Sequence, residues 1–565
     1  MKSFLLSLIC LLSAGALPAQ VVFQGYGVAP ENQANEFGQI ASYKNMLLFS
    51  GDDGNHPRQL WSCDGTVKGT QMVVHPPATT PSGVYDWVDY NGKMIFSGRD
   101  TGGTQPWITD GSSQGTYPLK YIPPDLIHGS YPDLFTVFNN QVFFITRSIN
   151  DTIRRLWHTD GTKAGTQPFG EIRTGHDMIL YNNKLFFVGY DDAHGFELWT
   201  SDGIEANTKL FMDINPGKND IVYRGIYPMN FIEYNGKLYF NADDGVHGSE
   251  LWVTDGTAQG THMVTDFHPG KTWTNIKAPI VYNGKIYFES DTGQIYVKSC
   301  LVTSDGTEAG TQLFVPAANT WPAVPVFIYK DMLYLCNGPD LPPAFFRTDG
   351  TTAGTVQVKD ARGIEVQSAI MPMGVSNTMF PLWPHYPGSA ATWASQPVFP
   401  INEYAGRLYF AARVDASTVL IQSDGTNQGT VEIAPPGLDP YFFLSYTAFA
   451  KHKDRLYFGG QFGTNPYQLW SVYDSAGLAG VEKITAQDIC TLFPNPSHGV
   501  VNISFKSTQR NIDINLTDLN GRIIQRSHFT ASANIQLDVR AMNTGIYFIN
   551  VIADDKKQSL KFIKE

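Results

Sequence analysis

The sequence has few cysteines and few charged residues, and both shortages exclude classes of protein. Five of 565 residues are cysteine, at irregular positions without a Cys-x-x-Cys or Cys/His pairing, so a disulfide scaffold and a zinc site have no support. An exported chain could form one disulfide, but the sequence does not show which cysteines would pair. Charged residues make up 16%, the formal net charge is -12, and no cluster of lysine or arginine is visible. We therefore expect no nucleic-acid partner.

Long apolar runs are missing beyond the N-terminus. Residues 1–19 hold one basic residue, Lys2, an apolar run over residues 4–12 and a small-residue end before Gln20. This pattern predicts a secretory signal peptide that is cut after Ala19. No later segment approaches the roughly 18 apolar residues that span a bilayer, so no transmembrane segment is expected.

A tryptophan motif recurs along the chain and sets a period of about 48 residues. Residues 250–257 read Glu-Leu-Trp-Val-Thr-Asp-Gly-Thr, and a degenerate copy lies at residues 468–471. A two-residue turn between apolar strands, such as Asn235-Gly236, recurs with the motif and predicts a type I′ hairpin. The aspartates of the eight versions are Asp64, Asp110, Asp160, Asp202, Asp255, Asp305, Asp349 and Asp424.

Four short strands per unit are typical of a propeller blade, whereas the coils of a parallel solenoid lack two tight antiparallel hairpins. We expect an all-β fold, with a β-propeller of eight or nine four-stranded blades over residues 20–480 and a small C-terminal β-sandwich. Residues 21–26 are expected to close the ring by adding an outer strand beside Trp470. Residues 481–491 would then be a linker, and residues 492–565 the sandwich.

One insertion, at about residues 360–399, breaks the period. It contains Trp383, Tyr386 and Trp393, whose rings could stack on a sugar; the alternative is that they fold the insertion onto the ring. Long loops within compact domains are often functional. These three residues are the candidate ligand-binding residues.

Two acidic loops suggest a metal. Asp243, Asp244 and Glu250 in one unit are echoed by Asp191 and Asp192 in another, and several oxygens on a glycine-containing loop could hold Ca²⁺. The alternative is an Asx-capped turn with a solvent-facing histidine. The absence of this loop from other units weakens the calcium interpretation. It is the one cofactor that the sequence suggests.

Repeated aspartates and tryptophans invite a catalytic interpretation, but residues that occur in nearly every unit are expected to stabilise the unit. Asp-Gly suits a tight turn, and the tryptophans suit packing between blades. No nucleophile elbow, metalloprotease helix, phosphate loop or Cys-His pair occurs, so no catalytic residue is assigned. Glycosidase carboxylates would come from different blades, at a spacing that the sequence does not reveal.

The motif at residues 250–257 resembles the ELWxxDGT repeat of large bacterial extracellular proteins, a family without a settled activity. The tail resembles the type A C-terminal sorting domain of the type IX secretion system of Bacteroidetes. That second resemblance implies engagement of the type IX machinery, and then release or attachment to the outer surface of the outer membrane. The residues that carry it are Pro494, Asn495, Pro496, Gly499, Gly521 and Gly545.

Together these patterns predict a secreted, surface-displayed propeller that binds an extracellular glycan or protein partner. Two alternatives stay open, because a fold does not determine a function. One is a hydrolase or lyase that acts on extracellular polysaccharide. The other is a structural component of the cell surface.

Overall fold

The computed structural model forms two compact units, one made of residues 19–474 and the other containing residues 475–565. Each is described by itself. The residues that the structure describes are 21–26, 29–30, 40–52, 59–73, 84, 86–122, 129–148, 151–217, 229–267, 269, 276–290, 300–315, 322–337, 344–368, 401–414, 417–443, 449–464, 468–474, 490–493, 497, 499–517, 523–540, 542, 545–553 and 556–564. Residues 1–19 lie outside these ranges, so the signal peptide stays a prediction.

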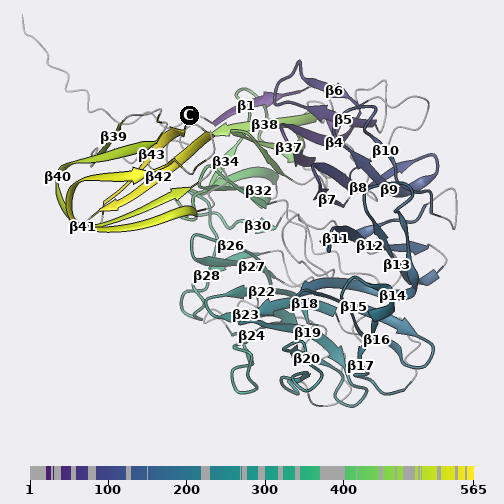
Figure 1. The fold of residues 1–565 in the computed structure, drawn as a ribbon. Coiled ribbons are helices and arrows are strands. Elements are labelled where there is room, and N and C mark those ends of the chain that lie inside the picture. Colours follow the sequence, from purple (N-terminus) through teal and green to yellow (C-terminus); the bar gives the residue numbers. More distant parts are fainter. Residues whose placement is uncertain are drawn as a thin grey trace, which may run out of the picture. The chain divides into compact units, whose positions relative to one another are not determined.

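The first unit is built from antiparallel sheets that follow one another in chain order, drawn from purple to green in Figure 1. Its first strands are β1 (Val21–Gly25), β2 (Ala29–Pro30), β3 (Ile40–Tyr43), β4 (Met46–Asp52), β5 (Gln59–Cys63), β6 (Thr70–Met72), β7 (Trp87–Tyr90), β8 (Lys93–Asp100), β9 (Gly103–Thr109), β10 (Tyr117–Pro118), β11 (Asp133–Phe138), β12 (Gln141–Ser148), β13 (Asp151–Thr159), β14 (Gln167–Tyr181), β15 (Lys184–Asp191), β16 (Gly195–Ser201) and β17 (Lys209–Met212). A 3₁₀ helix, η1 (Glu205–Asn207), precedes β17.

The same pattern continues to the end of this unit. Its later strands are β18 (Met229–Tyr234), β19 (Lys237–Asp243), β20 (Ser249–Thr254), β21 (His262–Met263), β22 (Lys277–Tyr282), β23 (Lys285–Ser290), β24 (Cys300–Ser304), β25 (Gln312–Leu313), β26 (Pro322–Tyr329), β27 (Met332–Asn337), β28 (Phe345–Thr348), β29 (Val356–Gln357), β30 (Gln367–Ser368), β31 (Ile401–Tyr404), β32 (Arg407–Val414), β33 (Ser417–Ser423), β34 (Val431–Ile433), β35 (Phe442–Phe443), β36 (Ala450–His452), β37 (Arg455–Phe462) and β38 (Gln468–Asp474).

Four repeats form a four-stranded sheet, as in the order β18-β19-β20-β21, and three others form sheets of five strands. Two successive repeats share one seven-stranded sheet because β14 runs without a break from the outer strand of one repeat into the inner strand of the next, pairing with β13 and then with β15. Sheets of this kind, repeated in sequence and packed face to face, make a β-propeller, so the predicted fold class is confirmed. The blade number of eight or nine stays a prediction.

The ring closes as the sequence predicted. β1 pairs antiparallel with β38, and Gly25 lies opposite Trp470. The first and last sheets also share one hydrophobic cluster that includes Trp61 of β5 and Tyr457 of β37. Closure therefore joins the two ends of the propeller by both main-chain pairing and side-chain packing.

Tryptophans of the motif lie between sheets, which confirms their predicted packing role. Trp107 of β9 packs with Leu48 of the preceding sheet, and Trp252 of β20 packs with Phe186 of the preceding sheet. Trp61 and Trp470 also donate indole N–H bonds of 3.1 Å to the carbonyls of Gly51 and Gly460 on the neighbouring strand of their own sheet. Each ring thus buries a large apolar area at a sheet interface.

Seven of the two-residue turns are hairpins with positive φ at both central residues, as Asn-Gly predicted. Asn235 has a φ of 49° and Gly236 of 68°. Lys330 and Asp331 adopt the same conformation at 45° and 57°. These are the angles that a type I′ turn requires, and they keep the inner hairpins at one end of every repeat.

The second unit is a small sandwich with one apolar core. Its strands are β39 (Cys490–Phe493), β40 (Val500–Thr517), β41 (Ile523–Asp538), β42 (Gly545–Ala553) and β43 (Lys556–Lys564). The first half of β40 pairs with β39 and β41, and its second half pairs with β41 and β42. Alternate residues such as Ile503, Ile514 and Val551 fill the core, which agrees with the predicted sandwich.

Candidate functional site

The repeated Asp-Gly-Thr aspartates are held by their own turns. Oδ1 of Asp255 accepts a bond of 2.8 Å from the backbone N–H of Thr257 and one of 2.7 Å from its hydroxyl, and these bonds lower the pKa of Asp255. The Thr257 hydroxyl oxygen accepts the N–H of Gly260 at 3.0 Å. The same bonds recur at Asp64, Asp110, Asp160, Asp305, Asp349 and Asp424. This confirms the predicted structural role of these carboxylates.

The turn must end in glycine because a larger residue would collide with the aspartate. A Cβ on Gly260 would lie 2.2 Å from Cγ of Asp255, a distance that real Cβ atoms essentially never show. One copy departs from this pattern, because Asn207 stands where glycine is expected. Its side chain donates a bond of 2.7 Å to Oδ2 of Asp202, so the carboxylate is still used within its own turn.

The glutamate of the motif caps the loop that leads to the next repeat. Glu197 accepts backbone N–H bonds from Ile214 at 2.8 Å and Asn215 at 2.9 Å. Burial raises its pKa to about 7. Glu250 accepts the N–H of Phe267 at 3.2 Å in the same way. Recurrence of the glutamate is the one feature of the sequence that could have pointed to this role.

The acidic loops are Asx-capped turns with a bonded histidine. Asp191 accepts the backbone N–H groups of Ala193 and His194, and its carboxylate lies 2.9 Å from Nδ1 of the same histidine. Asp244 and His247 repeat this arrangement, with the carboxylate 2.7 Å from Nδ1. In both loops the histidine ring is bonded to the carboxylate, so neither histidine ring projects freely into solvent.

The other two acids of these loops also have partners. Asp192 forms an ion pair of 2.7 Å with Arg173, and Asp243 accepts the backbone N–H of Gly245 at 2.7 Å. Within the described ranges, no group of three or more His, Cys, Asp or Glu residues is arranged to hold a metal ion. This geometry favours the turn, and calcium at Asp191, Asp192, Asp243, Asp244 and Glu250 stays a hypothesis.

Several candidate residues fall outside the described part of the chain. They are Trp383, Tyr386 and Trp393 of the insertion and Pro494, Asn495, Pro496 and Gly521 of the tail. Gly499 and Gly545 are described. Gly499 donates an N–H bond of 3.3 Å to Ser497 and its carbonyl accepts the N–H of Val539, whereas Gly545 begins β42 opposite Lys564.

Two buried carboxylates were not predicted. Asp177 of β14 is 3% exposed and accepts N–H bonds from Met178 at 2.9 Å and from Asn230 of the next sheet at 2.6 Å. Asp86 accepts the N–H of Phe135 at 3.4 Å. Burial raises the pKa of each to about 7, and Asp133 adds to the effect at Asp86. Both acids link neighbouring sheets, and each stands four residues before the tyrosine of its hairpin.

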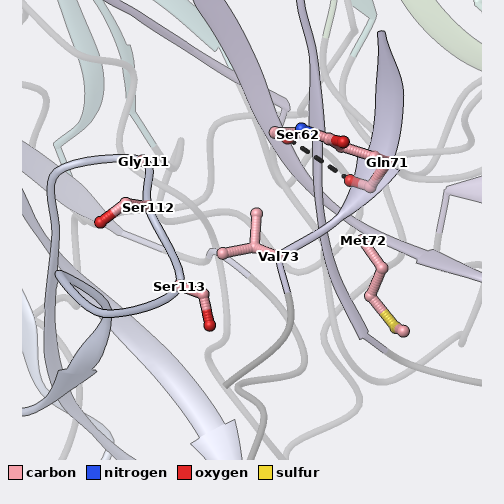
Figure 2. Close-up of a pocket in the computed structure, with 7 residues that line it drawn as sticks. All are labelled: Ser62, Gln71, Met72, Val73, Gly111, Ser112 and Ser113. Carbon is pink, nitrogen blue, oxygen red and sulfur yellow. Dashed lines mark hydrogen bonds between the residues drawn. The ribbon is translucent and has the colours of Figure 1, made fainter. Parts of the chain in front are cut away.

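A pocket of about 350 Å³ opens between the first and second sheets. Figure 2 shows residues 111–113 on one side, opposite Val73 and Met72. Ser62 and Gln71 complete the lining, joined by a bond of 3.4 Å from the Ser62 hydroxyl to the Gln71 carbonyl. The pocket therefore combines an apolar wall with hydroxyl and carboxamide groups, and none of its lining residues is charged.

This pocket lies where one copy of the motif departs from the others. Its turn reads Asp-Gly-Ser-Ser, with Ser113 at the position that Val67, Lys163 and Glu308 occupy in other turns. Ser112 also replaces the threonine of the Asp-Gly-Thr turns, and both serines line the pocket together with Gln71 and Met72 of β6.

The tail of the chain matches a known protein family. Residues 491–565 match the secretion system C-terminal sorting domain. This sorting domain marks the chain for the type IX secretion machinery and for a place outside the cell, either secreted or attached to the cell surface. The match does not extend to the propeller, so membership of the ELWxxDGT repeat family stays a prediction.

Among the solved structures that match the chain, three show only weak similarity. A structure from work on two prolyl endopeptidases has a TM-score of 0.35 and 10% identity, covering 69% of this chain and 55% of that one. Two structures of puromycin hydrolase, one complexed with PGG, have TM-scores of 0.33 and 0.32, 11% identity, and coverage of 67% of this chain and 58% of theirs. The chain thus spans little more than half of these structures, and no activity follows from them.

No curated protein matches the chain. Within the described residues, no helix combines the length and apolar composition that crossing a membrane requires.

Proposed function

We propose that the exported propeller is a binding protein displayed outside the cell, and that its partner is an extracellular glycan or protein. One observation carries this proposal. The polar residues that recur in nearly every repeat are used by the fold itself, while the pocket beside Ser113 opens where the repeat departs from its pattern. Function on a repeat scaffold is expected at such departures, since repeat-wide residues serve the repeat unit.

The pocket suits a neutral glycan. Its Gln71 carboxamide and Ser113 hydroxyl can exchange hydrogen bonds with sugar hydroxyls, and Met72 and Val73 offer an apolar surface to the faces of a sugar ring. The volume of about 350 Å³ lies at the lower end of the range for small-molecule sites. An ionic ligand would find no opposite charge among the lining residues.

A thermal melt of the full mature chain against a panel of neutral polysaccharides tests the proposal. A ligand that binds the native state raises the melting temperature by mass action. Each mixture is then examined by mass spectrometry, because cleaved products would show that the protein is a hydrolase or lyase and not a binding protein. A panel without shifts and without products would contradict a glycan ligand.

The chain offers a matched pair of variants. Ser113→Lys fills the pocket with a residue that the fold already accepts at the equivalent position, Lys163. Ala258→Lys makes the same change in a turn that does not line the pocket. We expect Ser113→Lys to abolish the ligand-induced shift and Ala258→Lys to preserve it. Equal shifts in both variants would place the ligand elsewhere.

A further inference from the structure

One position on the inner strands varies from repeat to repeat, whereas the residue after it is tyrosine in most repeats. It is the residue before the aromatic residue or histidine that precedes each hairpin turn. The central ring, as we name this set, consists of Ser42, Asp89, Val137, Leu180, Glu233, Val281, Ile328, Glu403 and Lys451. Because function on a repeat scaffold lies in such variation, the ring is a candidate surface.

The topology brings these residues together. At the ring position each strand pairs on one side only, as β18 does with β19 and β26 does with β27, so its other edge is free. Figure 1 places β7, β11 and β18 on the inner side of their sheets. Because each of the nine residues stands at the same distance from its hairpin, the nine lie at one level around the centre of the propeller.

One arc of the ring is apolar and open to solvent. Val137 is 39% exposed, Leu180 40% and Ile328 45%, and Val281 is half-buried. These side chains come from consecutive repeats, and only Glu233 interrupts them. Aliphatic side chains gathered in one exposed place mark an interaction surface, whereas scattered ones do not.

The acids of the ring have no counter-ion within the described ranges. Asp89, Glu233 and Glu403 are exposed, and none of them forms an ion pair there. Glu233 lies near Tyr181, and Glu403 near Tyr329, of the preceding repeat. The hydroxyls of these tyrosines donate to main-chain carbonyls, so they do not neutralise the acids. Lys451 is the one cation of the ring.

We propose that the central ring docks a peptide segment of an extracellular protein, one in which aliphatic side chains alternate with lysine or arginine. The apolar arc would bury the aliphatic side chains, and Glu233 in its middle would pair with a cation. Complementary charge selects this partner over an acidic one. A neutral glycan has little to bond among four aliphatic residues. The surface is distinct from the pocket beside Ser113, so the two proposals can fail separately.

Short synthetic peptides test this docking on the full mature chain. The probe alternates leucine with lysine, and two control peptides alternate leucine with glutamate and serine with lysine. Fluorescence anisotropy should show binding of the probe alone, weakening as salt is added. Equal binding of all three peptides, or binding of none, would overturn the proposal and leave the glycan melts unaffected.

Variants then locate the site. Glu233→Gln should weaken probe binding by about tenfold, the effect of losing one favourable contact of about 1.4 kcal/mol. Leu180→Ser with Ile328→Ser should weaken it at least as much. Matched controls are Glu308→Gln on an exposed turn and Leu313→Ser with Val356→Ser, whose residues are 43% exposed on outer strands. Circular dichroism confirms that each variant is folded. Ring variants that bind as tightly as their controls would refute the assignment.

Discussion

The hydroxyl of Tyr181 donates a hydrogen bond of 2.8 Å to the carbonyl of Gly236 in the next repeat. Tyrosines before the hairpin turn repeat this bond around the propeller, each reaching the second turn residue of the following repeat. The pairs are Tyr43–Gly92, Tyr90–Asn140, Tyr234–Gly284, Tyr282–Asp331, Tyr329–Gly406 and Tyr404–Asp454. These bonds therefore join the inner hairpins of successive repeats and stabilise the propeller near its centre.

Tyr181→Phe should lower the free energy of unfolding by about 1 kcal/mol, because it removes one hydrogen bond and leaves a carbonyl without its donor. Denaturant unfolding measures the change. Tyr441→Phe is the control, since Tyr441 is 48% exposed. Phe138 stands at the equivalent position without a hydroxyl, so Phe138→Tyr tests the converse and should stabilise the protein. Loss of stability in the control alone would contradict the role of the bond.

Gly260→Ala should destabilise the protein by roughly 1–3 kcal/mol, because the new methyl group would overlap the Asp255 carboxylate. Asp255→Ala alone removes the bonds to Thr257 and is destabilising for a different reason. The double variant removes the overlap, so its loss should be smaller than the sum of the single losses. Additive losses in a double-mutant cycle would show that the two residues do not compete for space.

The sequence was informative where a pattern is local. Asn235-Gly236 specifies its own backbone angles, and β1 could be placed beside Trp470 because the last repeat lacked an outer strand. The acceptor of Tyr181 could not be predicted, since it belongs to another repeat and any residue supplies a carbonyl. Asp177 was not predicted either, because its partner Asn230 lies across a sheet interface. The pocket lies between the turn of Ser113 and the strand β6 of another repeat, so the sequence alone could not reveal it.

All four described cysteines should be unreactive in the native protein. Cys63, Cys300, Cys336 and Cys490 are buried free thiols. Burial raises the pKa of Cys63 and Cys336, so the reactive thiolate is scarce. Maleimide followed by mass spectrometry should add no label to the folded mature chain and four labels after denaturation without reductant. Two fewer labels would reveal a disulfide.

Removing calcium should leave the propeller unchanged. The carboxylates of Asp191 and Asp244 already bond to the backbone and to His194 and His247, and Asp192 pairs with Arg173. We therefore expect equal melting temperatures with chelator and with added calcium. A melting temperature that rises with calcium, and falls back in Asp244→Asn, would establish the calcium site that the acidic loops suggested.

Stability should fall as the pH rises from 5 to 8, and Asp177 should account for part of the fall. Burial raises its pKa from 3.8 to about 7, so the native state binds this proton more tightly than the unfolded chain does. The resulting stabilisation is fully present below about pH 4 and is lost as the pH rises through 7. Asp177→Asn should flatten the dependence, measured by denaturant unfolding at several pH values. Asp255→Asn is the control, because the pKa of Asp255 is lowered and its titration lies below this window. An unchanged slope in Asp177→Asn would mean that this carboxyl is ionised throughout, held by the N–H groups of Met178 and Asn230.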